Sequence, residues 1–495
     1  MDIKRVVELQ SERGVKSIGS EVNKKSLESV IGECRRFIQS NLEGYREMDA
    51  LIKRERIKNL IMTYVMTNNP LVEGFIDEEN RLDVNRLVNK LIEEILDYGI
   101  LTRAILDPSV YEIRVNGKEI KVEIRGRVQD YTDENGNVLS FESVEQQDIV
   151  IRKLLGDVRL TPKDAIVNAR TVEGYRVAAV HNSAIGADPE DPQGSVYHAF
   201  VLRKFKKEKW SLSDLARFGT ISDNMARFLR LLPAGGLTFV TVGPTASGKT
   251  TLNNAILQAV PPSTRTILLQ NPSEIDLRFK DVLGRVYNDV LHLEAKEKEN
   301  PTHSDPTMEN LMAHILRLSP TFVCVGEMRK SIEFKLGMQI MQAGHPINAT
   351  YHAEDAYGAI ERYLTAYLAE SGNEPPNLAL ASLSRLLNIV IVQKFMRDGT
   401  RKVIQVSEVV PVDVMDIETD RKSIINDLFI FDIDGEPEYN EFGEVIKISG
   451  RHKRVGKLTE RTVRKFRLEG VRSSDYEFML EDPKDNEIET YTGNI

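Results

Sequence analysis

The 495-residue sequence has little cysteine and no long apolar run, and these absences exclude several classes of protein. Its two cysteines, Cys34 and Cys324, cannot by themselves build a disulfide framework or a tetrahedral zinc site, and such low usage suits a reducing cytosol. No segment approaches the ~18–20 apolar residues that a membrane-spanning helix needs, so we expect any membrane association to be peripheral. The first residues lack the apolar stretch of a secretory signal, and we therefore expect a cytoplasmic protein.

The apolar residues of the first half of the chain change from a helical to an alternating pattern. Apolar residues from Val84 to Leu96 recur at helical spacing, Asp83 stands at the N-cap position, and Gly99 supplies a stop. Two alternating runs, 111–115 and 120–124, flank Asn116-Gly117, which predicts a β-hairpin with both turn residues at positive φ. We predict further strands at 165–171, 175–180 and 198–205.

The second half of the chain alternates short apolar runs with helical stretches. This pattern is typical of a mainly parallel sheet that is covered on both faces. The predicted strands are 237–242, 266–269, 321–325, 347–350, 388–392, 403–410 and 428–431.

Residues 243–250 match the phosphate-binding pattern G-x-x-x-x-G-K-[ST] completely. Glycine lets the backbone curl so that successive N–H groups converge on phosphate oxygens, and the helix that follows directs the positive end of its dipole at the same anion. Lys249 would reach the β- and γ-phosphates, and the Thr250 hydroxyl would ligate magnesium. We therefore predict that ATP and Mg²⁺ bind here. The predicted binding residues are Gly243, Pro244, Thr245, Ala246, Ser247, Gly248, Lys249, Thr250 and Thr251.

Three later segments resemble, in the same order, the motifs of the type II/type IV secretion ATPase superfamily. Residues 319–329 resemble its Walker B segment, residues 343–352 its histidine box, and residues 267–274 its aspartate box. The resemblance covers roughly residues 80–475 and includes the N-domain entry at 95–99 and 113–117. It is strongest to the CpaF type, which powers tight-adherence pili and has relatives in conjugation machines.

The resemblance implies an α/β protein whose RecA-like P-loop motor domain follows a helical segment and a small α/β domain. The predicted parts are a helical region at 1–99, an α/β N-domain at 100–206, a linker at 207–232, the motor domain at 233–435 and a charged C-terminal extension at 436–495. We expect the extension to be appended to the main core and partly mobile. The resemblance also implies a homohexameric ring on the cytoplasmic face of the inner membrane, where ATP turnover drives a membrane platform protein.

The resemblance assigns catalytic roles to residues on both sides of the phosphate loop. Glu327 would position the attacking water and support magnesium, together with Thr250. Arg329, Arg176 and Arg203 would neutralise charge on the transferred phosphoryl group, and Arg170 and Lys204 lie where further N-domain cations are expected. The alternative for each arginine is an ordinary surface ion pair.

His345 and His352 flank a predicted strand. The resemblance implies that they sense nucleotide state by hydrogen bonding, and the alternative is a structural role at the two ends of the strand. With no third ligand at metal spacing, we expect no zinc site here.

The aspartate box departs from the family pattern. Gln270-Asn271 replace the usual Glu-Asp pair, and Glu274 remains. Amides cannot act as general bases and do not hold magnesium by charge. We therefore expect Glu327 and Glu274 to carry the chemistry, with Lys249, and we expect slower turnover than in relatives, which Gln270→Glu would raise.

Two other functions remain open from the sequence. The altered aspartate box also suits a nucleotide-binding switch or structural ring with little hydrolysis. The basic stretch from Lys447 to Arg472 suits a RecA-like nucleic-acid motor, but Phe466 is the aromatic residue within it and the net charge is −9, so we expect no direct nucleic-acid binding. The cargo is not determined by these patterns.

Overall fold

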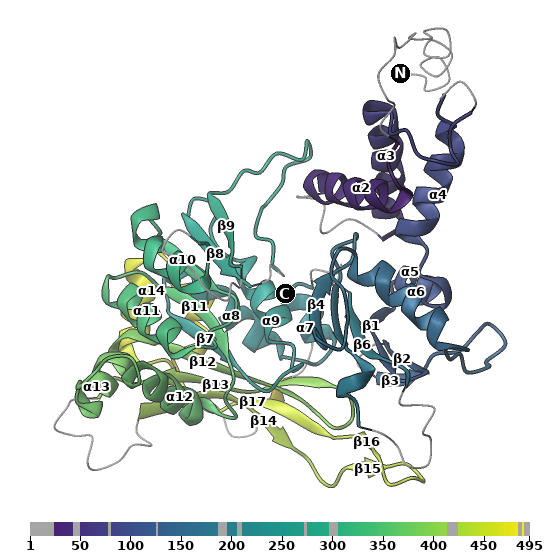
Figure 1. The fold of residues 1–495 in the computed structure, drawn as a ribbon. Coiled ribbons are helices and arrows are strands. Elements are labelled where there is room, and N and C mark those ends of the chain that lie inside the picture. Colours follow the sequence, from purple (N-terminus) through teal and green to yellow (C-terminus); the bar gives the residue numbers. More distant parts are fainter. Residues whose placement is uncertain are drawn as a thin grey trace. The chain divides into compact units, whose positions relative to one another are not determined.

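The computed structural model of the chain describes residues 24–42, 50–77, 81–124, 127–186, 196–204, 210–271, 275–296, 305–412, 424–483 and 488–489. The chain forms two compact units, unit 1 at residues 1–207 and unit 2 at residues 208–495. Figure 1 follows the chain from purple at the N-terminus to yellow at the C-terminus. Within the described residues, no helix combines the length and apolar character that a bilayer crossing requires.

Three helices at the start of unit 1 pack against one another (Figure 1): α2 (Leu27–Leu42), α3 (Ala50–Asn68) and α4 (Val84–Leu96). The sequence prediction of α4 is confirmed. The side chain of Asp83 accepts a hydrogen bond from the backbone N–H of Arg86 at 3.0 Å, which caps the helix. The apolar stripe of α4 is buried against α2 and α3. It also packs near Val172, which lies in a turn between two strands of the following sheet.

A six-stranded antiparallel sheet forms the rest of unit 1, in the order β3-β2-β1-β6-β5-β4. Its apolar face packs on α5 (Thr102–Leu106) and α6 (Val144–Leu155). The hairpin predicted around residues 116–117 is confirmed, but its turn lies one residue later. Asn116 pairs with Glu119, so the turn residues are Gly117, at φ 64°, and Lys118. The strands are β1 (Val110–Asn116), β2 (Glu119–Ile124), β3 (Arg127–Asp130), β4 (Ile166–Arg170), β5 (Arg176–Val180) and β6 (Ala199–Arg203).

Unit 2 is built on a ten-stranded sheet in the order β18-β17-β14-β13-β12-β7-β11-β10-β8-β9. The strands from β12 to β9 in this order are parallel, whereas β13, β14, β17 and β18 extend the sheet in antiparallel pairing. The seven strands predicted between residues 237 and 431 are all present. The strands are β7 (Phe239–Val242), β8 (Thr266–Gln270), β9 (Val290–Glu294), β10 (Phe322–Val325), β11 (Ile347–Tyr351), β12 (Ile389–Phe395), β13 (Arg401–Val409), β14 (Ile425–Ile433), β17 (Gly450–Arg454) and β18 (Ile488–Glu489), with a separate pair β15 (Glu438–Tyr439) and β16 (Val445–Lys447).

Both faces of the parallel strands are buried, because alternate residues enter two different apolar cores. Phe239 of β7 and Cys324 of β10 face one core, whereas Val240 and Val323 face the other. The first core is closed by α7, α8, α9 and α14, and the second by α10, α11, α12 and α13. These helices are α7 (Leu212–Arg217), α8 (Asp223–Ala234), α9 (Lys249–Leu257), α10 (Met308–Ile315), α11 (Ser331–Gln342), α12 (Ala356–Leu368), α13 (Pro376–Leu386), α14 (Glu460–Leu468) and α15 (Ser473–Tyr476).

The linker that we predicted at 207–232 contains a packed helix, α7, and leads into a second helix, α8. Its polar residues are helix caps: Ser211 forms a capping box with Asp214 before α7, and the Ser222 side chain accepts from the backbone N–H of Met225 in α8. The apolar faces of both helices lie in the core of unit 2. The polar residues that made this segment resemble a linker are therefore, in part, helix caps.

The C-terminal extension is not appended to the core, contrary to our expectation. Strand β17 pairs with β14, and Phe466 of α14 is fully buried. The buried Glu408 carboxylate of β13 accepts hydrogen bonds from the backbone N–H of Thr459 at 3.0 Å and from the hydroxyl of Thr462 at 2.6 Å. These contacts make residues 450–468 part of the motor core.

Candidate active site

The phosphate loop lies between β7 and α9. Gly243 has φ 150° and Gly248, the N-cap residue of α9, has φ 99°. A Cβ atom on Gly243 would lie 2.0 Å from the backbone oxygen of Gln393 in β12, so only glycine fits there. The Ser247 hydroxyl is buried and has no hydrogen-bond partner among the described residues. A tight loop, an orphan hydroxyl and a helix N-terminus together fit a phosphate group.

Lys249 and the two threonines after it occupy the first turn of α9. Lys249 is 8% exposed, and its ammonium group donates to the carbonyl oxygens of Gly243 and Pro244, both at 2.9 Å. Burial lowers the pKa of Lys249, and the charge of Glu327 opposes that shift. Thr250 is half-buried at the start of the same helix. The lysine is thus held over the loop and near an acid from another strand.

Glu327 lies just past the end of β10 and is bound on both carboxylate oxygens. One oxygen accepts from Arg329 at 2.8 and 2.5 Å. The other lies 3.1 Å from Nε2 of His352, whose Nδ1 lies 3.0 Å from the carbonyl oxygen of Gly243. His352 therefore links the predicted catalytic acid to the phosphate loop.

Strand direction explains which predicted residues meet. In the sheet β7 pairs with β11, and β11 pairs with β10, all in parallel, so their carboxyl ends lie at one edge. The loop at Gly243, Glu327 and His352 all follow the carboxyl ends of these strands. His345 precedes β11 and lies at its opposite end, away from this group. The two histidines thus flank β11, as the sequence predicts, but only His352 lies at the edge with the phosphate loop and Glu327.

The side chain of Gln270, in the altered aspartate box, forms two hydrogen bonds with the backbone of Ile275. Its buried amide donates to the backbone oxygen of Ile275 at 2.9 Å and accepts from the backbone N–H of Ile275 at 2.7 Å. A glutamate could not donate to that oxygen, so the amide suits this position better than the usual acid. Glu274, the remaining acid of the box, lies outside the described residues.

The predicted N-domain arginines form a row on the sheet of unit 1. Arg203 of β6 is directly opposite Arg176 of β5, which is directly opposite Arg170 of β4. Directly opposite residues project from the same face, here the face away from the apolar core of unit 1. Glu112 of β1 ends the row and accepts from Arg203 at 2.6 Å.

Lys204 departs from that row. Its ammonium group is buried and donates to the backbone oxygens of Ala104, at 3.2 Å, and Asp107, at the end of α5. Carbonyl groups at a helix C-terminus attract a cation. We therefore assign Lys204 a structural role, which corrects its grouping with Arg203.

Two residues from the β12–β13 hairpin contact the phosphate loop and were not selected as site residues from the sequence. Arg401 donates to the backbone oxygen of Ala246 at 3.2 Å, and its guanidinium lies 4.7 Å from the ring centre of Phe395. A Cβ atom on Gly248 would lie 3.0 Å from the Gln393 amide nitrogen. Gln393 lies in β12, which pairs with the loop strand β7, and Arg401 begins β13, which pairs with β12.

Known proteins resemble this chain in sequence. The chain matches the family described as type II/IV secretion system protein over residues 83–427, which is more than half of its length. It is 28% identical over 228 residues to an uncharacterized protein of Methanocaldococcus jannaschii, covering 46% of this chain and 36% of that protein. It is 26% identical over 310 residues to the type II secretion system ATPase E of Vibrio cholerae, covering 62% of this chain and 54% of that protein.

The chain thus matches about a third to a half of the length of these two relatives. Among solved structures, the Legionella pneumophila ATPase DotB aligns with a TM-score of 0.43 and 22% identity, covering 66% of this chain and 83% of that one. The family match extends from α4 through the phosphate loop, Glu327 and His352 to β14. The chain belongs to the type II/IV secretion system protein family.

Proposed function

We propose that the chain is the ATP-hydrolysing motor subunit of a pilus, secretion or conjugation apparatus, of the CpaF type. The observation that supports this most is the link through His352, which contacts both the carbonyl oxygen of Gly243 and the carboxylate of Glu327. A phosphate loop joined to an acid at a neighbouring strand end is the arrangement that hydrolysis of a nucleoside triphosphate requires. The secretion ATPase of Vibrio cholerae, with which the chain shares 310 aligned residues, supports the same reaction class.

Each residue of the site has a defined task in this proposal. Lys249 exchanges the carbonyl oxygens of Gly243 and Pro244 for the β- and γ-phosphates of ATP. Thr250 and Glu327 would hold Mg²⁺, which supplies positive charge to the phosphates when it is bound. Glu327 also orients the attacking water.

The arginines complete the proposal. Arg329 already pairs with Glu327, and the row of Arg176 and Arg203 carries positive charge on a single face of unit 1. We propose that they stabilise the transferred phosphoryl group from the same or a neighbouring subunit. The chain would act as a homohexamer on the cytoplasmic face of the membrane and move a platform protein.

The decisive experiment measures steady-state phosphate release by the purified full-length chain with Mg-ATP. Lys249→Ala and Glu327→Gln should each lower turnover by about 100-fold or more, since they remove the phosphate-binding cation and the water-orienting acid. Lys335→Ala is the matched control, because Lys335 is an exposed lysine of the same unit that donates to the backbone oxygen of Glu370. Full activity in Lys249→Ala would show that hydrolysis does not occur in this loop.

A nucleotide-binding switch with little hydrolysis is the second candidate, and Gln270 favours it. The structure changes our expectation for Gln270→Glu, because glutamate would bury a charge and lose the hydrogen bond to Ile275. We now expect this substitution to lower thermal stability and to leave turnover unchanged or lower. A faster ATPase with unchanged melting temperature would restore the original interpretation of the aspartate box.

The nucleic-acid motor is disfavoured because the basic stretch is used internally. Arg461 of α14 donates to the backbone oxygens of Ser384 and Val409, at 3.2 and 3.1 Å. Lys465 donates to the side chain of Asn388 at 3.0 Å. Other cations of the stretch form ion pairs with acids of unit 2: Lys447 with Glu438, Arg451 with Asp434, Lys453 with Asp432, and Arg467 with Glu460. Cations with internal partners offer less charge to a phosphate backbone.

A further inference from the structure

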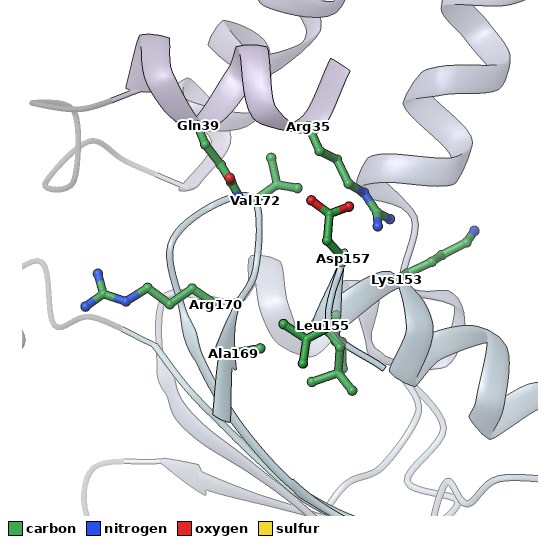
Figure 2. A pocket seen from close by; sticks show the side chains of 11 residues that line it. Arg35, Gln39, Lys153, Leu155, Asp157, Ala169, Arg170 and Val172 are labelled. Atoms are coloured by element: carbon green, nitrogen blue, oxygen red, sulfur yellow. The ribbon is translucent and has the colours of Figure 1, made fainter. Parts of the chain in front are cut away.

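A cavity of about 240 Å³ lies within unit 1, where α2, the end of α6 and the β4–β5 hairpin meet (Figure 2). Apolar side chains such as Leu155, Ala169 and Val172 form part of its lining. This cavity contains none of the residues to which the proposed ATPase site assigns catalysis. One lining residue, Arg170, also belongs to the arginine row of the sheet.

Arg35 is the most deeply buried charged residue that lines the cavity, at 8% exposed. One terminal nitrogen, Nη2, donates to the backbone oxygen of Glu94 at 3.3 Å. Its Nε is buried and has no hydrogen-bond partner among the residues that the structure describes. A buried guanidinium N–H costs free energy unless an acceptor reaches it, so Arg35 has hydrogen-bonding capacity that the described residues leave unused.

The charges around the cavity are mainly positive. Arg35, Lys153 and Arg170 line it together with one acid, Asp157. The side chain of Asp157 is 55% exposed and lies 3.8 Å from that of Arg36, so the acid is at the rim and is partly neutralised. The lining therefore attracts anions more strongly than cations.

The side chains that line the cavity point in different directions. Figure 2 shows Gln39 extending from α2 toward Val172 and Arg35 extending from α2 beside Asp157, whereas Lys153 and Arg170 extend away to opposite sides. The ammonium group of Lys153 donates to the backbone oxygen of Glu93 at 3.1 Å. Arg35 and Gln39 are thus the donors that we consider for a ligand, and the charge of Lys153 is partly neutralised by Glu94, whose carboxylate lies 3.8 Å away.

We propose that this cavity binds a small oxyanion, a phosphate or a carboxylate, with Arg35 and Gln39 as its hydrogen-bond donors. A guanidinium group presents parallel N–H donors that match two oxygens of either anion. The apolar side chains beside them accommodate a short apolar body on the ligand. Asp157 opposes the anion and weakens its binding.

Binding of inorganic phosphate and of propionate to the full-length chain, measured by titration calorimetry at constant ionic strength, tests the proposal. The protein carries Lys249→Ala, so that the phosphate loop contributes little to the signal. We expect saturable binding of at least one probe, and the stronger probe identifies the headgroup. Arg35→Gln should weaken binding about tenfold, because a charged hydrogen bond is lost.

Two further variants keep the test independent of the folding of Arg35→Gln. Asp157→Asn removes the lining acid at an exposed position and should tighten binding about threefold or more. Arg103→Gln, an exposed arginine of the same unit that is 3.7 Å from Glu134, should bind like the parent protein. Absence of saturable binding of both probes would overturn the proposal, and so would unchanged affinity in Asp157→Asn. Either result leaves the proposed ATPase activity unaffected.

Discussion

The two units of the chain gather functional residues in different ways. In unit 2, residues far apart in sequence meet because parallel strands end at one edge: Gly243, Glu327 and His352 follow β7, β10 and β11. Their chemistry is complementary, because the His352 ring contacts both the carbonyl oxygen of Gly243 and the carboxylate of Glu327. In unit 1, Arg203, Arg176 and the next arginine of the row meet because antiparallel strands pair them directly.

The two sites differ in charge, because unit 2 combines an acid, a histidine and a lysine, whereas the row in unit 1 holds three arginines with one acid at its end. Like charges directly opposite one another on a sheet are destabilising. Glu112, at one end of the row, compensates Arg203 and also accepts from Arg114 at 2.6 Å, so it is shared. A row of positive charge that is retained on one face suits a negatively charged partner, which the proposed function identifies as the phosphates of ATP.

The largest expected effect comes from Gly243→Ala, which breaks the parallel-strand site. The added Cβ would meet the backbone oxygen of Gln393 at 2.0 Å and would disfavour φ 150°, so the loop cannot close beside β12. We expect ATP hydrolysis to fall by about 100-fold or more, since the loop positions the phosphates. Gly344→Ala is the control, because Gly344 also has positive φ, at 91°, but nothing within 4 Å of an added Cβ. It should cost about 1 kcal/mol of stability and keep activity.

The second-largest expected effect is a loss of stability at low pH that is caused by His452, a buried polar residue of unit 2 outside the site. His452 of β17 is buried, and its Nε2 donates to the backbone oxygen of Val403 at 3.1 Å. Burial, and then the charge of Lys402, lower its pKa from 6.5 to about 4. Between pH 6.5 and about 4, His452 is therefore mainly neutral in the native state but mainly protonated in the unfolded chain.

Its contribution to stability is present in full above pH 6.5 and is lost as the pH falls from 6.5 to about 4, by about 3 kcal/mol. Urea unfolding at pH 7 and pH 4.5 measures this loss, and His452→Gln, which can still donate to Val403, should show a smaller loss. Equal losses in both proteins would show that other groups cause the acid sensitivity.

The strands and the phosphate loop could be predicted from sequence because each depends on a local pattern. The β7 strand and the loop after it are specified by neighbouring residues, and so is the cap of α4 at Asp83. The function of Gln270 could not be predicted, because its partner is a backbone group of Ile275 that only the fold brings within 2.9 Å. The same holds for Arg401, whose contact with Ala246 spans 155 residues of sequence.

Two regional predictions were wrong for a related reason. The predicted linker at 207–232 and the predicted extension at 436–495 are rich in polar residues, yet α7 of the first and β17 and α14 of the second belong to the core and sheet of unit 2. Ser222 caps a helix, and Arg461 donates to carbonyl oxygens of the motor core. Composition gave the correct polarity, but it does not reveal whether a polar side chain faces water or binds the backbone.

The third prediction tests whether the arginine row is functional. Arg176→Gln removes the central charge between Arg203 and Arg170, so it should lower ATP turnover about tenfold while it leaves the melting temperature nearly unchanged. Thermal unfolding and phosphate release are measured on the same preparation. Arg152→Gln, in α6 of the same unit, should change neither. A lower melting temperature with full turnover would make Arg176 a structural residue.

The smallest expected effect separates the two histidines that flank β11. His352 contacts Gly243 and Glu327, so His352→Gln should lower turnover about fivefold and change the KM for ATP less, because the ring holds the acid rather than the nucleotide. His345→Gln lies at the other end of the strand and should leave both parameters of the isolated subunit unchanged. The strand is thus a built-in control, since one substitution is made at each end of the same element. If His345→Gln slowed turnover as much as His352→Gln, the relevant contact would have to come from a second subunit, and the parallel-strand edge would be only part of the site.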